Sequence, residues 1–203
     1  MKCIYSLMAI AFLLVPVKQA DAVLWNKILV SYNTQVFTLW DVYREFQLAR
    51  VNSDVSIESS ISKEELKSFT KKLVVEYLVT EEAESFKIGE ISEEDQRDAF
   101  TKFKGRFQNK GAFDHFMQRY SWTEMELKQS LIRPLKADKF IKEKILSAYV
   151  FLSTEEIEEY HKKYPHFTLE EAKDQLKKKR IQENLRDWIE SLKIRYEITS
   201  LWD

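Results

Sequence analysis

Glycine, proline and cysteine are all scarce in this chain. Its 203 residues include three glycines, three prolines and one cysteine, whereas glycine and proline together form about 12% of an average protein. Turn-rich sandwiches and barrels, and enzymes with glycine-rich phosphate loops, need more of these residues. Charged residues form 32% of the chain and hydrophobic residues 44%, which is typical of a folded, helix-rich protein. The net charge of −1 gives no electrostatic reason to expect nucleic acid or anionic lipid as a partner.

The first 22 residues have the pattern of a secretory signal peptide. Lys2 precedes an apolar stretch over residues 4–17, and small residues end the segment at Ala22. A membrane anchor is the alternative, but the apolar stretch is shorter than the roughly 20 residues of a spanning helix and contains Pro16. We therefore expect export with cleavage after Ala22, and no stable membrane insertion afterwards.

The single cysteine, Cys3, lies inside this expected signal peptide. Residues 23–203 therefore contain no thiol and cannot form a disulfide framework. Thiol nucleophiles and cysteine-ligated zinc are excluded for the same reason. Hydrophobic packing must stabilise this part of the chain on its own.

Helix starts are the clearest local signals in the sequence. In a capping box, a serine or threonine precedes the helix and an acid follows three positions later, so each side chain bonds the other residue's backbone N–H. Five pairs have this spacing: Ser62 with Glu65, Ser92 with Asp95, Ser121 with Glu124, Ser153 with Glu156, and Thr168 with Glu171. Thr38 with Asp41 is a sixth, and the two pairs that end in aspartate are imperfect boxes. We expect Pro134 to kink the helix after Ser121, and Gly111 and Pro165 to mark breaks between helices.

The two ends of the exported chain are β-prone. Residues 28–32 and 36–38 flank a polar break at 33–35, as in a hairpin. Apolar spacing from Leu169 to Leu192 predicts a last long helix, and residues 196–202 after it are again β-prone. We therefore expect a mainly α protein in which a small β-sheet pairs an N-terminal hairpin with a C-terminal strand.

No motif for catalysis or metal binding is present in the sequence. His161 and His166 flank Pro165 at a spacing that does not place both on one helical face, and they are interpreted, like His115, as surface residues. The basic run at 177–180 spreads around a helix between acidic residues, which indicates a solvated face rather than a nucleic-acid site. We therefore predict no catalytic residue, no metal and no cofactor.

An aromatic and methionine cluster lies in residues 111–125. Most of it is expected to be core, but the helix before Ser121 is too short to bury aromatics on every face, so part of the cluster is expected to border a cleft. Methionine and aromatic side chains together form an adaptable surface for apolar segments. The candidate client-binding residues are Phe113, Phe116, Met117, Tyr120, Trp122 and Met125.

The order of these elements resembles that of the SurA-type periplasmic chaperones. Residues 30–38, with Asn33, Val36 and Thr38, resemble the hairpin that this family writes as V-x-N-x-x-I-T. Residues 151–160 are similar to the V-S-x-E-E-I-x-x-Y segment that precedes the family's parvulin isomerase domain. That domain is missing here, because only residues 165–167 lie between Tyr164 and the helix that begins at Thr168.

The resemblance implies one SurA-like chaperone domain over residues 23–203, in the periplasm and without prolyl isomerase activity. Its N-terminal part would span 23–164, and 168–203 would supply the C-terminal helix and closing strand. The expected function is that of an ATP-independent holdase that binds unfolded polypeptides, chiefly outer-membrane proteins. A non-catalytic interaction or assembly subunit for one envelope partner is the alternative, and a residual prolyl isomerase is a third class. A homodimer stays open.

Overall fold

The computed structural model describes residues 26–55, 60–146 and 150–202. The expected signal peptide and its cleavage site lie outside these ranges. In chain order the elements are β1 (Ile28–Tyr32), β2 (Gln35–Thr38), α1 (Leu39–Asn52), α2 (Lys63–Phe86), α3 (Glu93–Lys104), α4 (Lys110–Arg119), α5 (Glu124–Phe140), the π-helix η1 (Ile141–Leu146), α6 (Thr154–Lys163), α7 (Leu169–Arg195) and β3 (Thr199–Ser200). The prediction of a mainly α protein is confirmed.

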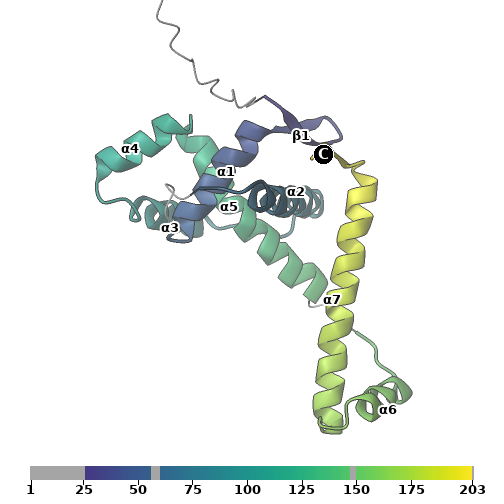
Figure 1. Cartoon of the computed structure of the whole chain (residues 1–203). Coiled ribbons are helices and arrows are strands. Elements are labelled where there is room, and N and C mark those ends of the chain that lie inside the picture. The colour runs from purple at the N-terminus through teal and green to yellow at the C-terminus, as the bar shows by residue number, and fades with distance from the viewer. Residues whose placement is uncertain (1–25, 56–59, 147–149, 203) are drawn as a thin grey trace, which may run out of the picture.

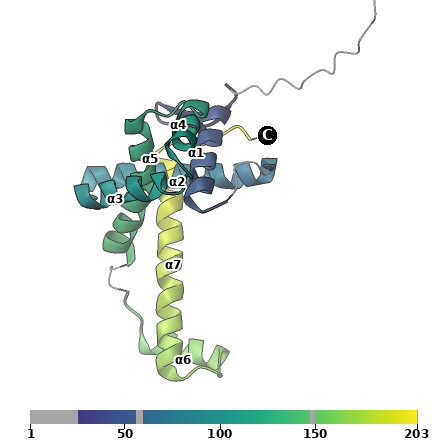
Figure 2. The ribbon, with the colours of Figure 1, turned by 90° about the vertical axis from the view of Figure 1, so that its left-hand side faces the viewer.

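The molecule consists of a helical body and a projecting arm (Figure 1). Helices α1 to α5 form the body, and the C-terminal end of α7 lies against it beside the strands. The N-terminal part of α7 extends beyond the body, and α6 lies at its far end, as the turned view also shows (Figure 2). Among the described helices, none combines the length and apolar character that a membrane span requires.

A three-stranded antiparallel sheet joins the two ends of the described chain. Its strand order is β2-β1-β3, with Val30 opposite both Phe37 and Ser200. The predicted pairing of an N-terminal hairpin with a C-terminal strand is therefore confirmed. Asn33 makes the hairpin turn with φ of 46°, a left-handed conformation that asparagine tolerates better than most residues.

Most of the predicted helix starts are confirmed as N-caps. Full capping boxes occur at Thr38, Ser62, Ser153 and Thr168, each with the predicted acid as its partner. Thr38 was expected to be imperfect, but its N–H donates to the Asp41 carboxylate at 2.9 Å. Ser92 caps α3 through its hydroxyl alone.

The predicted helix start at Ser121 is wrong. The N-cap of α5 is Thr123, which forms a full capping box with Glu126. Ser121 instead belongs to the end of α4, where it has φ of 51°. Its N–H donates to Gln118 O, and the N–H of Trp122 donates to Met117 O. This is the Schellman arrangement, which pairs the last carbonyls of a helix.

The expected break at Gly111 is also misplaced. Gly111 lies inside α4, and the chain turns earlier, between Gly105 and the N-cap Asn109. The break at Pro165 is confirmed between α6 and α7. Helix α5 runs through Pro134 and passes into the π-helix η1 at Ile141.

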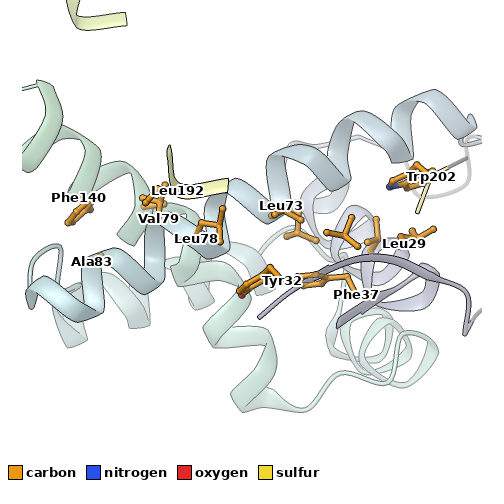
Figure 3. Close-up of a cluster of buried hydrophobic side chains, with 14 residues drawn as sticks. Leu29, Tyr32, Phe37, Leu73, Leu78, Val79, Ala83, Phe140, Leu192 and Trp202 are labelled. Atoms are coloured by element: carbon orange, nitrogen blue, oxygen red, sulfur yellow. The ribbon is translucent and has the colours of Figure 1, made fainter. Parts of the chain in front are cut away.

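The interior is divided into two hydrophobic clusters. The first joins the sheet to α2, to the end of α5 and to the end of α7, and its members include Leu29, Phe37, Leu73 and Leu192. Figure 3 shows these side chains, with Tyr32 beside Phe37 at a ring distance of 5.9 Å. The second cluster joins α1, α3, α4 and the start of α5. Its buried members are Leu48, Phe103, Phe113, Phe116, Tyr120, Trp122, Leu127 and Leu131.

Candidate functional site

Four of the six candidate client-binding residues are interior residues of the second cluster. They are Phe113, Phe116, Tyr120 and Trp122, with exposed fractions between 1% and 8%. Their enclosure removes them as surface contacts in this fold, which corrects the expectation that they border a cleft. Met117 is half-buried against the same cluster, and only Met125 is open to solvent, with 68% of its surface exposed.

The spacing of the aromatics explains why the expectation failed. Phe113, Phe116 and Tyr120 stand at i, i+3 and i+7, so they share one face of α4. Side chains of α1, α3 and α5 cover that face, with the Phe116 ring centroid 5.7 Å from that of Phe103 and 4.9 Å from that of Tyr120. A short helix covered in this way can bury all its aromatics.

A cleft of about 530 Å³ opens in the body between the hairpin, α1, α2 and α5. Its volume falls within the range of ligand pockets, roughly 300–1,000 Å³, but its walls are mostly polar. The lining residues are Tyr32, Gln35, Arg44, Glu45, Tyr77, Thr80, Glu81, Glu84, Gln96, Glu126, Gln129, Ser130, Ile132, Arg133 and Lys136. We call this space the central cleft.

A buried ion pair lies in the wall of the central cleft. Arg133 donates to Glu45 at 2.8 Å, and both side chains are less than 10% exposed. The Ser130 hydroxyl donates to the other Glu45 oxygen at 2.7 Å, and the Arg133 guanidinium lies 4.1 Å from the centre of the Tyr77 ring. These contacts compensate much of the cost of removing both charges from water.

The electrostatic environment of this pair changes the pKa values of its neighbours. Burial raises the pKa of Glu76, which lies 3.9 Å from Arg133 Nε, although Arg133 opposes that rise. For Arg133 itself, burial favours a lower pKa, but the negative charge of Glu45 and the proximity of Tyr77 raise it above its ordinary value. Arg133 is therefore charged throughout the physiological range.

Further ion pairs line the central cleft. Arg44 contacts Glu126 at 3.4 Å and stacks over the Trp122 ring at 4.0 Å. Lys136 contacts Glu84 at 2.8 Å. These contacts hold α1, α2 and α5 together around the cleft.

The remaining acid of the cleft, Glu81, accepts a hydrogen bond from the Tyr32 hydroxyl at 3.0 Å. Burial and the Glu81 charge together raise the pKa of Tyr32. Its phenol is therefore a permanent donor at neutral pH.

The chemistry available in the central cleft is charge and hydrogen bonding. Among the described residues, no group of three or more His, Cys, Asp or Glu side chains is placed to hold a metal ion. No local sequence pattern indicates this cleft, because its residues come from six elements and lie far apart in the chain. The Arg133–Glu45 contact, for example, joins residues 88 positions apart.

The arm presents apolar side chains that belong to neither cluster. Ile181, Leu185 and Ile189 of α7 are half-buried but pack against neither of the two hydrophobic clusters. Phe151, which precedes α6, and Ile194, near the end of α7, are 71% and 79% exposed. The ion pair of Glu156 with Arg180 at 2.7 Å ties α6 to α7.

The tip of the arm is aromatic. The Tyr160 and Tyr164 rings lie 4.7 Å apart, and the Phe167 and His166 rings 4.1 Å apart. Leu169 follows at the first position of α7 and is 53% exposed. The arm therefore combines a small packed tip with exposed apolar side chains along its length.

Comparison of the chain with protein-family models, with curated proteins and with solved structures finds no match.

Proposed function

We propose that this protein is a non-catalytic, ATP-independent holdase of the periplasm, which binds apolar segments of unfolded envelope proteins, chiefly outer-membrane proteins. The resemblance of the sequence to SurA-type chaperones supports this proposal. The observation that carries it is the α6–α7 arm, which extends beyond the body and exposes apolar side chains that neither core cluster uses.

The arm replaces the buried aromatics as the proposed client surface. Its exposed members are Phe151, which precedes α6, Leu169 at the first position of α7, and Ile194 in the last turn of α7, where the arm meets the body. Half-buried Ile181 and Leu185 lie between Leu169 and Ile194. Each exposed anchor contributes about 1.5–3 kcal/mol when fully covered, and association costs remove much of that sum. The expected binding is therefore weak and reversible, as a holdase requires.

Aggregation of a denatured outer-membrane porin, followed by light scattering after dilution, tests the proposal. The protein comprising residues 23–203 should suppress scattering without ATP. A triple variant, Phe151→Ser, Leu169→Ser and Ile194→Ser, should lose most of this effect, because all three side chains are at least half exposed and their loss spares the core. Circular dichroism of the variant verifies that it is folded.

Met125→Ser is the matched control, because it also removes an exposed apolar side chain, but from the body. It should leave suppression intact. If Met125→Ser loses suppression and the triple variant keeps it, clients bind the body rather than the arm. No suppression by the unaltered protein at several-fold excess contradicts the holdase. A single stoichiometric partner in pull-downs from envelope extracts would then favour the assembly subunit.

A further inference from the structure

The charges that line the central cleft do not balance. Its acidic residues are Glu45, Glu81, Glu84 and Glu126, and its basic residues are Arg44, Arg133 and Lys136. Each basic residue is paired with one of the acids other than Glu81. Within the described ranges, no Lys, Arg or His nitrogen lies within salt-bridge distance of the Glu81 carboxylate, whose hydrogen bond comes from the neutral Tyr32.

Neutral groups with unused hydrogen-bonding capacity accompany Glu81 in the cleft. The side chain of Gln129 makes no hydrogen bond to any described residue. Gln96 donates through Nε2 to Ile91 O at 2.9 Å, which leaves its side-chain oxygen as an acceptor. A guanidinium has five N–H donors and no acceptor, so it is satisfied by one carboxylate together with neutral acceptors of this kind.

A polypeptide can supply the positive charge that the cleft lacks, because its arginine and lysine side chains are cations with several hydrogen-bond donors.

We propose that the central cleft is a subsite for an arginine or lysine side chain of a bound polypeptide, with the Glu81 carboxylate as its counterion. The subsite rests on the proposed holdase function and adds a feature to the client, a basic residue beside the apolar segment held by the arm. A single unpaired carboxylate beside neutral acceptors suits one organic cation. A divalent metal ion would need several carboxylates, and the described residues hold no such group.

A titration followed by ¹⁵N–¹H NMR tests this subsite without any unfolded client. The probe is the tripeptide acetyl-Gly-Arg-Gly-amide, and the comparison is the same peptide with citrulline, which is nearly isosteric and neutral. The arginine peptide should shift the amide signals of Tyr32, Glu81 and Gln129 in a saturable way. The citrulline peptide should bind about tenfold more weakly, because it loses a charge-assisted hydrogen bond.

Two variants of α2 locate the effect. Glu81→Gln keeps an acceptor for Tyr32 but removes the charge. It should weaken binding of the arginine peptide about tenfold. Glu64→Gln removes the same charge from an exposed site near the start of α2 and should change nothing. Equal binding of both peptides, shifts outside the cleft, or an unaltered titration in Glu81→Gln overturns the proposal. Porin aggregation is measured separately, so a failure of the subsite is distinguishable from a failure of the holdase function.

Discussion

Individual buried charges decide how the body is held together. Glu45 of α1 and Arg133 of α5 are both nearly enclosed, and Ser130 occupies the second Glu45 oxygen. A buried ion pair of this kind contributes little net stability relative to apolar side chains, but the loss of one partner leaves the other charged and unpaired. The pair therefore enforces one mutual placement of α1 and α5.

Glu45→Ala should lower the free energy of unfolding by about 3–5 kcal/mol, because it leaves Arg133 buried without its main partner. Arg133→Met should be costly for the converse reason. The double variant should cost clearly less than the sum of the two single changes. Urea unfolding followed by circular dichroism measures all three, and strictly additive losses would show that the pair does not act as a unit.

Two tyrosines make stability depend on alkaline pH. The hydroxyl of Tyr196 donates to Glu82 at 3.0 Å, and burial together with this bond raises the pKa of Tyr196 to about 12. The pKa of Tyr32 is raised as well, by burial and by Glu81. Both phenols therefore keep their protons in the folded protein at a pH where the unfolded chain, with tyrosine pKa values of about 10, releases them.

The free energy of unfolding should consequently fall as the pH rises from about 10 to about 12, since unfolding then releases protons. Tyr196→Phe should have a shallower fall, because it removes one of the two groups. Urea unfolding across this pH range compares the two proteins. Identical slopes would exclude Tyr196 as a source of the pH dependence.

At the scale of single elements, local hydrogen bonds set where each helix begins. Five of the seven described α-helices start with a full capping box, in which the glutamate or aspartate side chain also bonds the N-cap backbone. These bonds lower the pKa of acids such as Glu65 and Glu171. Because the pattern is local, sequence spacing predicts most of it.

Substitutions at Thr123 and Ser121 separate the two roles at the junction of α4 and α5. Thr123→Ala should cost about 1 kcal/mol, because it removes the N-cap of α5. Ser121→Gly should leave stability unchanged or raise it by up to about 1 kcal/mol, since glycine adopts positive φ without strain. Thermal unfolding measures both changes in stability. A larger loss of stability in Ser121→Gly than in Thr123→Ala would show that Ser121 is the N-cap of α5.

At the scale of the whole molecule, the C-terminal residues close the first hydrophobic cluster. The N–H of Leu201 donates to Leu29 O at 2.8 Å, and Trp202 is 6% exposed among residues of the hairpin and α2. Arg195 also donates to the buried Glu82 of α2 at 2.8 Å. The base of the arm is therefore anchored to the body at several points.

Trp202→Ala should lower the free energy of unfolding by about 3–5 kcal/mol, because it removes a large buried side chain. The neighbouring Leu201 is 46% exposed, so Leu201→Ala should cost much less. Urea unfolding compares the two variants. Losses of equal size would mean that the C-terminal residues stabilise the protein through the backbone alone.

Local sequence patterns determined the helical class, most helix starts, the hairpin and the β-prone C-terminal end. Each depends on residues a few positions apart, such as Ser62 with Glu65. The choice between Thr123 with Glu126 and Ser121 with Glu124 was open in the sequence, because both pairs have the spacing of a capping box. Only the tertiary structure decided that α4 buries its aromatic face. The tertiary structure also determined where the central cleft lies, because charged residues such as Glu45 and Arg133 come into contact only when distant helices pack. Burial and long-range charge pairing depend on the packing of whole elements, which local spacing does not specify.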